Sequence, residues 1–391
     1  MANIIDYIAW RGDIPVTQVP IGEIDALILS YLSYMPYEAI ISPSLTLDEV
    51  ILADAAEALL ERGLFSLAMM DAAKYDKRLL EAVAVSRRFG PMRLSGYVSH
   101  ADEAEEKQFS AVTFLPEVGP AFIAFRGTDS TVVGWKEDFN MAFSGETPSQ
   151  REAVSYLESV SAAVGGRFIL GGHSKGGNLA AYASVFAAPQ VRERVDVVYN
   201  FDGPGFNEAI LSSTEFDAIR HRILTFVPQT SIIGILLWHT ESFTVVRSDG
   251  LGLLQHNPYT WQLMGGSFIR VSGRTGSSRL ADETIKRWLS DLTPQKRRQV
   301  IDGIYSVLSA SDGENVSDLF ELRNVQMILR ALGDMDEETK DAITDAFRSL
   351  GASLKEIIPG FVDRTAGEFL QKMRTDRAAK ALPTDGADSN T

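Results

Sequence analysis

Two kinds of hydrophobic spacing divide the first 280 residues of the chain. In segments 23–34, 47–64 and 66–85, apolar residues recur every three or four positions, which is the period of a helix with one buried face. A polar helix-start signal, with Thr46 as its first residue, precedes the second of these segments. We therefore expect residues 1–90 to form a helical N-terminal segment that packs on the core.

Short apolar runs of strand type begin after residue 90. The expected strands span residues 92–98, 108–115, 121–125, 167–171, 195–201, 222–227 and 243–247. The expected helices between the later strands span residues 149–164, 176–188 and 207–219. Strands that alternate with helices favour a parallel sheet with helices on its faces. The pattern predicts an α/β core over residues 91–280.

The pattern changes again from residue 281 onward, where helical spacing continues without strand signals. We expect a helical C-terminal extension over residues 281–374, and assign it no role. Residues 375–391 are polar and are predicted to be a disordered tail.

One stretch of the predicted core contains a candidate catalytic motif. Gly172-His173-Ser174-Lys175-Gly176 is a G-x-S-x-G pentapeptide that follows an apolar strand and precedes an Ala-rich helix. Strand, tight turn and helix are the context of a nucleophile elbow, which presents a serine hydroxyl at the top of a parallel sheet. The alternative is a serine that caps a helix in an unrelated α/β protein. A phosphate-binding loop does not fit, because G-x-x-x-x-G-K is absent.

The composition argues against several classes of partner and of catalytic or metal site. The formal net charge is −15 at pH 7, which argues against nucleic acid or an anionic membrane as a general partner. The chain has no cysteine, so disulfides, thiolate metal sites and a cysteine nucleophile are excluded. The sequence shows no signal peptide and no apolar run long enough to span a bilayer. The expected localisation is cytoplasmic.

An activated serine needs a base, and the chain offers five histidines. His256 follows the strand 243–247 through a loop. A loop after a late strand is where folds with a nucleophile elbow place their catalytic histidine. His239 is the second choice, and a protein without a catalytic histidine is the third possibility. Three histidines are expected to have other roles: His100, His173 and His221.

The orienting acid is expected at a strand end. Asp202 follows the strand 195–201 and precedes a Gly-Pro-Gly turn, so its carboxylate would lie at the active edge of the sheet. A turn-capping aspartate is the alternative. Asp249, which is close to His256 in sequence, is the weaker candidate.

Two backbone amides are expected to form an oxyanion hole. Lys175 follows the serine at a helix N-terminus, and Thr128 follows an early strand before the nucleophile. Arg126 is expected to brace this loop by pairing with Asp138 or Asp129. The scattered histidines show no metal-ligand spacing, and no cofactor is expected.

Four motifs together resemble the class 3, fungal-type triacylglycerol lipases, and more closely a bacterial lipase-like family of unknown function. The motifs are Phe125-Arg126-Gly127-Thr128, Trp135-Lys136-Glu137-Asp138, the segment 172–180, and Phe201-Asp202-Gly203-Pro204-Gly205. The resemblance covers roughly residues 20–270 and implies an α/β-hydrolase fold with carboxyl-ester hydrolysis. It implies Ser174 as nucleophile, His256 as base, and Thr128 with Lys175 at the oxyanion.

The chain departs from the lipase pattern at two places. Lipases of this type usually have Leu where Lys175 stands, and they have an Asp in the segment that corresponds to residues 228–232. Without that Asp, the triad uses Asp202, the site works as a dyad, or the protein is inactive. The apolar segment 232–238 would line an acyl pocket, act as a lid, or form a core helix.

The sequence therefore predicts a serine hydrolase of the esterase or lipase type, acting through an acyl-enzyme on a small-molecule or lipid ester. A thioesterase or peptidase on the same scaffold is an intermediate possibility. The alternative from another class is a catalytically inactive hydrolase-fold protein that binds a lipid or a protein partner. The oligomeric state is not predicted.

Overall fold

The computed structural model describes residues 2–41, 50–66, 73–102, 104–128, 137, 141, 146–231, 233–235, 237–241, 243–250 and 252–275. The predicted helical extension 281–374 and the predicted tail 375–391 lie outside these residues. The limits of the predicted segments, at residues 90 and 280, stay predictions.

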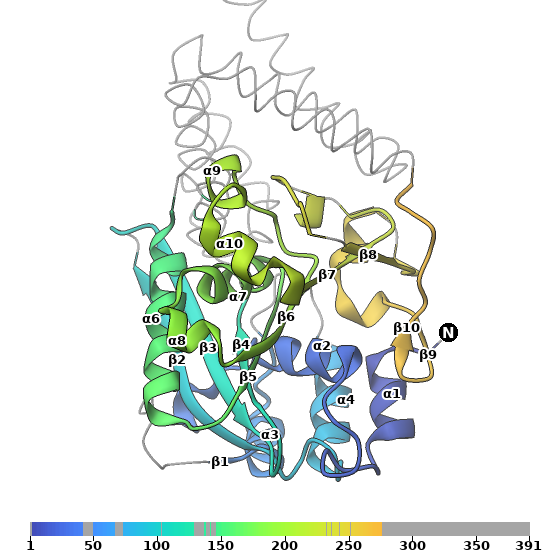
Figure 1. Cartoon of the computed structure of the whole chain (residues 1–391). Helices are drawn as coiled ribbons and strands as arrows, with labels where there is room; N and C mark the ends of the chain where they lie inside the picture. Colours follow the sequence, from blue (N-terminus) through green and yellow to red (C-terminus); the bar gives the residue numbers. More distant parts are fainter. Residues whose placement is uncertain are drawn as a thin grey trace, which may run out of the picture.

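The secondary structure follows the predicted order (Figure 1). The strands are β1 (Val50–Ile51), β2 (Arg93–Asp102), β3 (Lys107–Leu115), β4 (Ala121–Phe125), β5 (Phe168–His173), β6 (Val195–Phe201), β7 (Ile223–Pro228), β8 (Phe243–Val246), β9 (Leu263–Met264) and β10 (Ser267–Phe268). The α-helices are α1 (Ile4–Arg11), α2 (Glu23–Leu32), α3 (Leu52–Arg62), α4 (Ala73–Ala84), α6 (Pro148–Ala163), α7 (Lys175–Phe186), α8 (Pro189–Arg192), α9 (Glu208–Leu211) and α10 (Thr214–Ile219). The 3-10 turns are η1 (Tyr37–Ala39), η2 (Arg220–Arg222), η3 (Ile233–Ile235), η4 (Gly252–His256) and η5 (Pro258–Thr260).

Within the described residues, eight strands form one sheet in the order β1-β2-β3-β4-β5-β6-β7-β8. The strands from β1 to β4 pair antiparallel, and those from β4 to β8 pair parallel. Phe125 is in register with Gly172, and His173 with Phe201. The carboxyl ends of β4, β5 and β6 therefore meet at one edge, as parallel pairing requires. This is the α/β-hydrolase fold that the sequence predicted.

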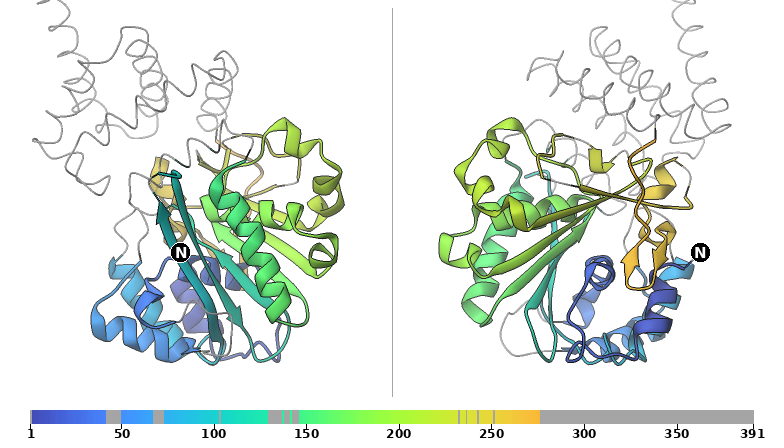
Figure 2. Two further views of the ribbon diagram at one scale, coloured as in Figure 1. Left: turned by 90° about the vertical axis from the view of Figure 1, so that its left-hand side faces the viewer. Right: turned by 45° about the vertical axis from the view of Figure 1, so that its right-hand side comes forward.

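Helices cover both faces of the sheet (Figure 2). Side chains alternate along each strand, and β4 shows the consequence: Phe122 packs with the N-terminal helices, while Ile123 packs with α6 and α7. The N-terminal helices bury a continuous apolar cluster with the strands on their side. Within the described residues, no helix is both long and apolar enough to cross a bilayer.

Two predicted helices differ from the structure in detail. The segment 47–64 yields α3 only from Leu52, because Val50–Ile51 pairs with β2. The segment 207–219 is broken into α9 and α10, since the Asn207 side chain caps the first helix and the Ser213 side chain caps the second. Serine and asparagine side chains compete with the helical hydrogen bonds of the backbone, so a helix often begins or ends at such residues.

Candidate active site

Ser174 lies at the turn between β5 and α7, with φ 58° and ψ −135°. A positive φ is strained for a residue with a side chain, and such strain is a feature of nucleophile elbows. The flanking glycines permit the turn: a Cβ on Gly172 would overlap the carbonyl of Gly176, and a Cβ on Gly176 would overlap the carbonyl of Phe125. The predicted elbow geometry is therefore present.

His256 and Asp202 are brought together at the same edge of the sheet. Nδ1 of His256 lies 2.7 Å from Oδ2 of Asp202, although the two residues are 54 positions apart. Asp202 follows β6 and is fully buried, and the His256 side chain is 11% exposed. Because an ionised carboxylate only accepts, Nδ1 carries the hydrogen, and Nε2 of the neutral ring is left as an acceptor. Asp202, and not Asp249, is the carboxylate that contacts His256.

Ser231 holds the second oxygen of Asp202, which the sequence analysis missed. Its hydroxyl donates to Oδ1 of Asp202 and accepts a hydrogen bond from the Gly234 amide at 3.0 Å. A Cβ on Gly234 would overlap Oδ1, so the carboxylate is tightly enclosed. Ser231 lies within the segment 228–232, where the lipase pattern has an aspartate. The structure thus has a hydroxyl donor there, bonded to an acid at the end of the preceding strand.

His173 was expected to have a packing role, and it also makes hydrogen bonds. Its Nε2 lies 2.7 Å from the carbonyl oxygen of His256, and its Nδ1 lies 3.2 Å from the hydroxyl of Tyr34. The rings of His173 and His256 pack with centroids 4.4 Å apart. A carbonyl only accepts, so Nε2 donates. Burial, and then the neighbouring His256, hold the pKa of His173 well below its ordinary value.

Gly127 places the Thr128 loop against the elbow. A Cβ on Gly127 would lie 2.9 Å from the Cβ of Ser174, so only a glycine backbone fits there. Thr128, the next residue, is buried. Lys175 is the first residue of α7, where backbone N–H groups and the helix dipole favour negative charge. The two predicted oxyanion donors thus belong to chain segments that adjoin Ser174.

The Lys175 side chain forms a buried ion pair that the sequence analysis also missed. Its Nζ lies 2.9 Å from Oε2 of Glu137, and both side chains are at most 1% exposed. Glu137 belongs to the Trp135-Lys136-Glu137-Asp138 motif, so the sequence singled out the segment but not its partner. The predicted partners of Arg126, Asp129 and Asp138, lie outside the described residues.

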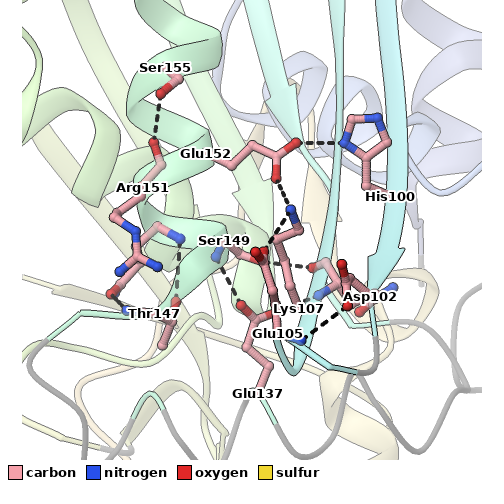
Figure 3. A network of polar contacts seen from close by, with 12 residues as sticks. His100, Asp102, Glu105, Lys107, Glu137, Thr147, Ser149, Arg151, Glu152 and Ser155 are labelled. Carbon is pink, nitrogen blue, oxygen red and sulfur yellow. Dashed lines mark hydrogen bonds and ion pairs between the residues drawn. The ribbon is translucent and has the colours of Figure 1, made fainter.

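The other candidate groups are engaged elsewhere. Nδ1 of His239 lies 2.7 Å from Glu241, whose carboxylate also accepts from Thr225 at 2.9 Å. The side chain of His100 lies 2.7 Å from Glu152 (Figure 3), and Asp249 is exposed. Within the apolar segment 232–238, residues 233–235 form the turn η3. In the described part of the chain, no group of three or more His, Asp or Glu side chains could hold a metal ion.

Comparison with known proteins identifies the family. The family described as Mbeg1-like matches residues 83–306, which is more than half of the chain. The chain belongs to the Mbeg1-like family. The match includes β4, the elbow, Asp202 and His256. It supports a lipase-like relationship, whereas the assignment to class 3 lipases and to bacteria stays a prediction.

Two solved lipase structures are similar to parts of this Mbeg1-like chain. M37 lipase has 15% identity and a TM-score of 0.31, over 48% of this chain and 69% of that chain. A fungal lipase in complex with an inhibitor has 15% identity and a TM-score of 0.30, over 44% of this chain and 68% of that chain. The comparison with curated proteins found no match.

Proposed function

We propose that this Mbeg1-like protein is a serine hydrolase that cleaves carboxyl esters, with Ser174 as nucleophile, His256 as general base and Asp202 as the orienting acid. The observation that carries the proposal is the 2.7 Å contact between His256 Nδ1 and the buried Asp202 carboxylate, next to a strained serine elbow. Acyl transfer by a serine requires a histidine and a buried carboxylate beside it. Here Asp202 contacts His256, and the His256 ring packs on His173, the residue before Ser174.

In this proposal, the proton path begins with the hydrogen bond between His256 Nδ1 and Asp202. With Nδ1–H donated to Asp202, Nε2 takes the proton of the Ser174 hydroxyl while the serine oxygen attacks the acyl carbonyl. The imidazolium, stabilised by Asp202, then returns that proton to the alcohol that leaves. A water molecule, activated by the same nitrogen, releases the acid from Ser174.

The negative charge on the acyl oxygen requires donors that are already in place. The amides of Thr128 and Lys175 supply them in this proposal, and neither has to reorganise because each is fixed by neighbouring structure. The Gly127 backbone lies against Ser174, and Lys175 is the first residue of α7. The chemistry needs no cofactor.

The substrate class is a carboxyl ester, of small-molecule or lipid type. The test measures hydrolysis of p-nitrophenyl esters of increasing acyl length by wild type and by Ser174→Ala, with folding of both checked by circular dichroism. Wild type turns over at least one ester, and Ser174→Ala falls to the background rate. A wild-type rate equal to that of a folded Ser174→Ala variant on every ester would instead favour an inactive hydrolase-fold protein.

A further inference from the structure

Lys175 has two parts with different surroundings. Its backbone amide is a proposed oxyanion donor, while its side chain runs into the interior. There, Nζ donates to Oε2 of Glu137 at 2.9 Å, to the carbonyl oxygen of Gln108 at 2.7 Å and to Oε1 of Gln108 at 3.2 Å. Three acceptors satisfy the three hydrogens of an ammonium group. The first residue of α7 is thereby fixed to the start of β3.

Glu137 is equally well bonded. Besides Lys175, its carboxylate accepts from the amide of Gln108 at 3.0 Å, and from the amide and hydroxyl of Ser149 at 3.0 and 2.7 Å. Figure 3 shows Glu137 and Ser149 pointing toward one another at the start of α6. One carboxylate therefore connects β3, α6 and α7. Its side chain is 0% exposed, so solvent does not compete for these bonds.

A pair of this kind is not required for packing. Removing two charges from water carries a desolvation penalty that an apolar pair would not have, and apolar replacements of buried ion pairs are often neutral or stabilising. The charged pair adds directional contacts. Hydrogen bonds to Glu137 and Gln108 fix the position of the Lys175 side chain, which apolar contacts would not do.

The position of Glu137 in the chain relates these hydrogen bonds to the proposed oxyanion hole. Glu137 lies in the connection between β4 and α6, and that connection begins with Arg126, Gly127 and Thr128. The described contacts run through β3: Lys175 and Glu137 both bond Gln108, and two residues later the Ser110 carbonyl accepts from the Arg126 amide at 2.9 Å. Arg126 lies two residues before Thr128, which carries the other proposed oxyanion donor. An oxyanion hole acts only when both donors are held at the distance set by the transition state.

We propose that Glu137 is a positioning residue: through its buried ion pair with Lys175, it fixes the N-terminus of α7 relative to the Thr128 loop and so sets the oxyanion hole. This inference rests on the proposed ester hydrolysis. It explains why a lysine follows the nucleophile in this chain, and it assigns a role to the Glu of the Trp-Lys-Glu-Asp motif.

The first test variant is Glu137→Gln. A carboxamide cannot accept on both sides: with its oxygen toward Lys175, its NH₂ group faces the amide of Ser149 and repels it. We expect kcat to fall about 10- to 100-fold, less than the full loss of an oxyanion donor. KM for p-nitrophenyl butyrate should change less than about twofold, since the donors act mainly in the transition state. The affinity for an alkyl boronic acid, which forms a tetrahedral serine adduct, should fall in parallel with kcat.

A double variant separates positioning from stability. Lys175→Met leaves the buried Glu137 carboxylate unpaired and should destabilise the fold strongly. Lys175→Met combined with Glu137→Gln removes both charges, so most of the lost stability should return, while kcat stays low because the hydrogen bonds that orient α7 are absent. A merely structural role predicts that kcat recovers with stability.

The chain offers a matched control in the buried ion pair of Arg88 with Asp25, whose side chains are also 1% exposed. This pair connects α2 to the residues that follow α4, at the end of α2 remote from His173. Asp25→Asn should lower the free energy of unfolding without changing kcat of the folded protein.

Hydrogen exchange of the amides at residues 175–178, measured in the absence of substrate, provides a readout independent of activity. We expect faster exchange there in Glu137→Gln than in wild type or Asp25→Asn. If wild type hydrolyses esters and folded Glu137→Gln keeps its kcat, boronate affinity and exchange rates, the inference is overturned while the proposed function stands. If wild type hydrolyses no ester, the proposed function fails, and unchanged exchange in Glu137→Gln would overturn the positioning role separately.

Discussion

The Nδ1 atom of His256 lies 2.7 Å from the Oδ2 atom of Asp202, at the carboxyl edge of the parallel strands. Asp202 is fully buried and has a positive φ of 52°, a strained conformation for a residue with a side chain. Strain of this kind persists only where the surrounding structure enforces it. Here the enclosing contacts come from Ser231 and Gly234, and they fix the carboxylate in the direction of His256.

Asp202→Asn should lower kcat by about 10³- to 10⁴-fold with little change in KM, because an amide that donates toward Nδ1 favours the wrong tautomer of His256. The measurement is steady-state hydrolysis of p-nitrophenyl butyrate. Asp249→Asn serves as the matched control, since Asp249 is exposed, and it should retain the wild-type rate. Loss of activity in Asp249→Asn with retention in Asp202→Asn would reverse the assignment of the acid.

Ser231→Ala should reduce both stability and rate. Oδ1 of Asp202 loses its buried donor, so the free energy of unfolding should fall by about 1–3 kcal/mol, and kcat should fall about 3- to 10-fold as Asp202 becomes less well oriented. Urea denaturation and ester hydrolysis measure the two effects. Ser213→Ala, which removes the cap of α10, should lose a similar stability of about 1 kcal/mol and no activity. Full activity in Ser231→Ala would show that this hydroxyl does not orient the acid.

His173 should make the fold less stable as the pH falls. Its folded-state pKa lies below the ordinary value of 6.5 because of burial and then of His256, so between these pKa values the unfolded chain binds more protons. Stability therefore rises with pH through this window and is lost on acidification. If His173 stays neutral when folded, its contribution to the change in the free energy of unfolding from pH 7.5 to 5.5 is a loss of about 1.4 kcal/mol.

His173→Gln is the variant that isolates this effect, because its amide can still donate to the His256 carbonyl but does not titrate in this range. The comparison of wild type with this variant is needed because burial raises the pKa of Asp76, which acts in the opposite sense. Urea unfolding at the two pH values provides the measurement. An equal pH dependence in both proteins would contradict a neutral, buried His173.

Gly172→Ala should destabilise the protein by about 3 kcal/mol or prevent folding, because its Cβ would overlap the carbonyl of Gly176 and neither backbone can move freely. Gly165→Ala is the control, since a Cβ there meets nothing within 4 Å. Thermal denaturation should show a large loss for the first variant and little change for the second. Equal melting temperatures would mean that strand and helix do not approach closely at the elbow.

The sequence predicted the parts of the fold that are periodic or depend on a residue type. Short apolar runs indicated the core strands, and the glycines at 172 and 176 indicated the elbow, because only glycine permits that approach. The end of a strand pointed to Asp202, since the carboxyl ends of parallel strands share an edge.

The contacts that the sequence did not predict join groups from distant segments of the chain. Ser231 with Asp202, His173 with the His256 carbonyl, and Lys175 with Glu137 depend on which rotamers meet in the interior, and no local period encodes that. The departures from the lipase pattern were the available signal. Lys175 was noted as unusual, and a buried lysine implies a buried partner.

The most direct test of the account is active-site labelling with a fluorophosphonate, followed by mass spectrometry of the tryptic peptides. The reagent forms a stable adduct only with an activated serine, so it reports on nucleophile, base and oxyanion donors together. We expect one phosphonyl group per wild-type molecule, located on Ser174, and no label on folded Ser174→Ala. Folded wild-type protein without a label on Ser174, under conditions that label a known serine esterase, would contradict the central claim.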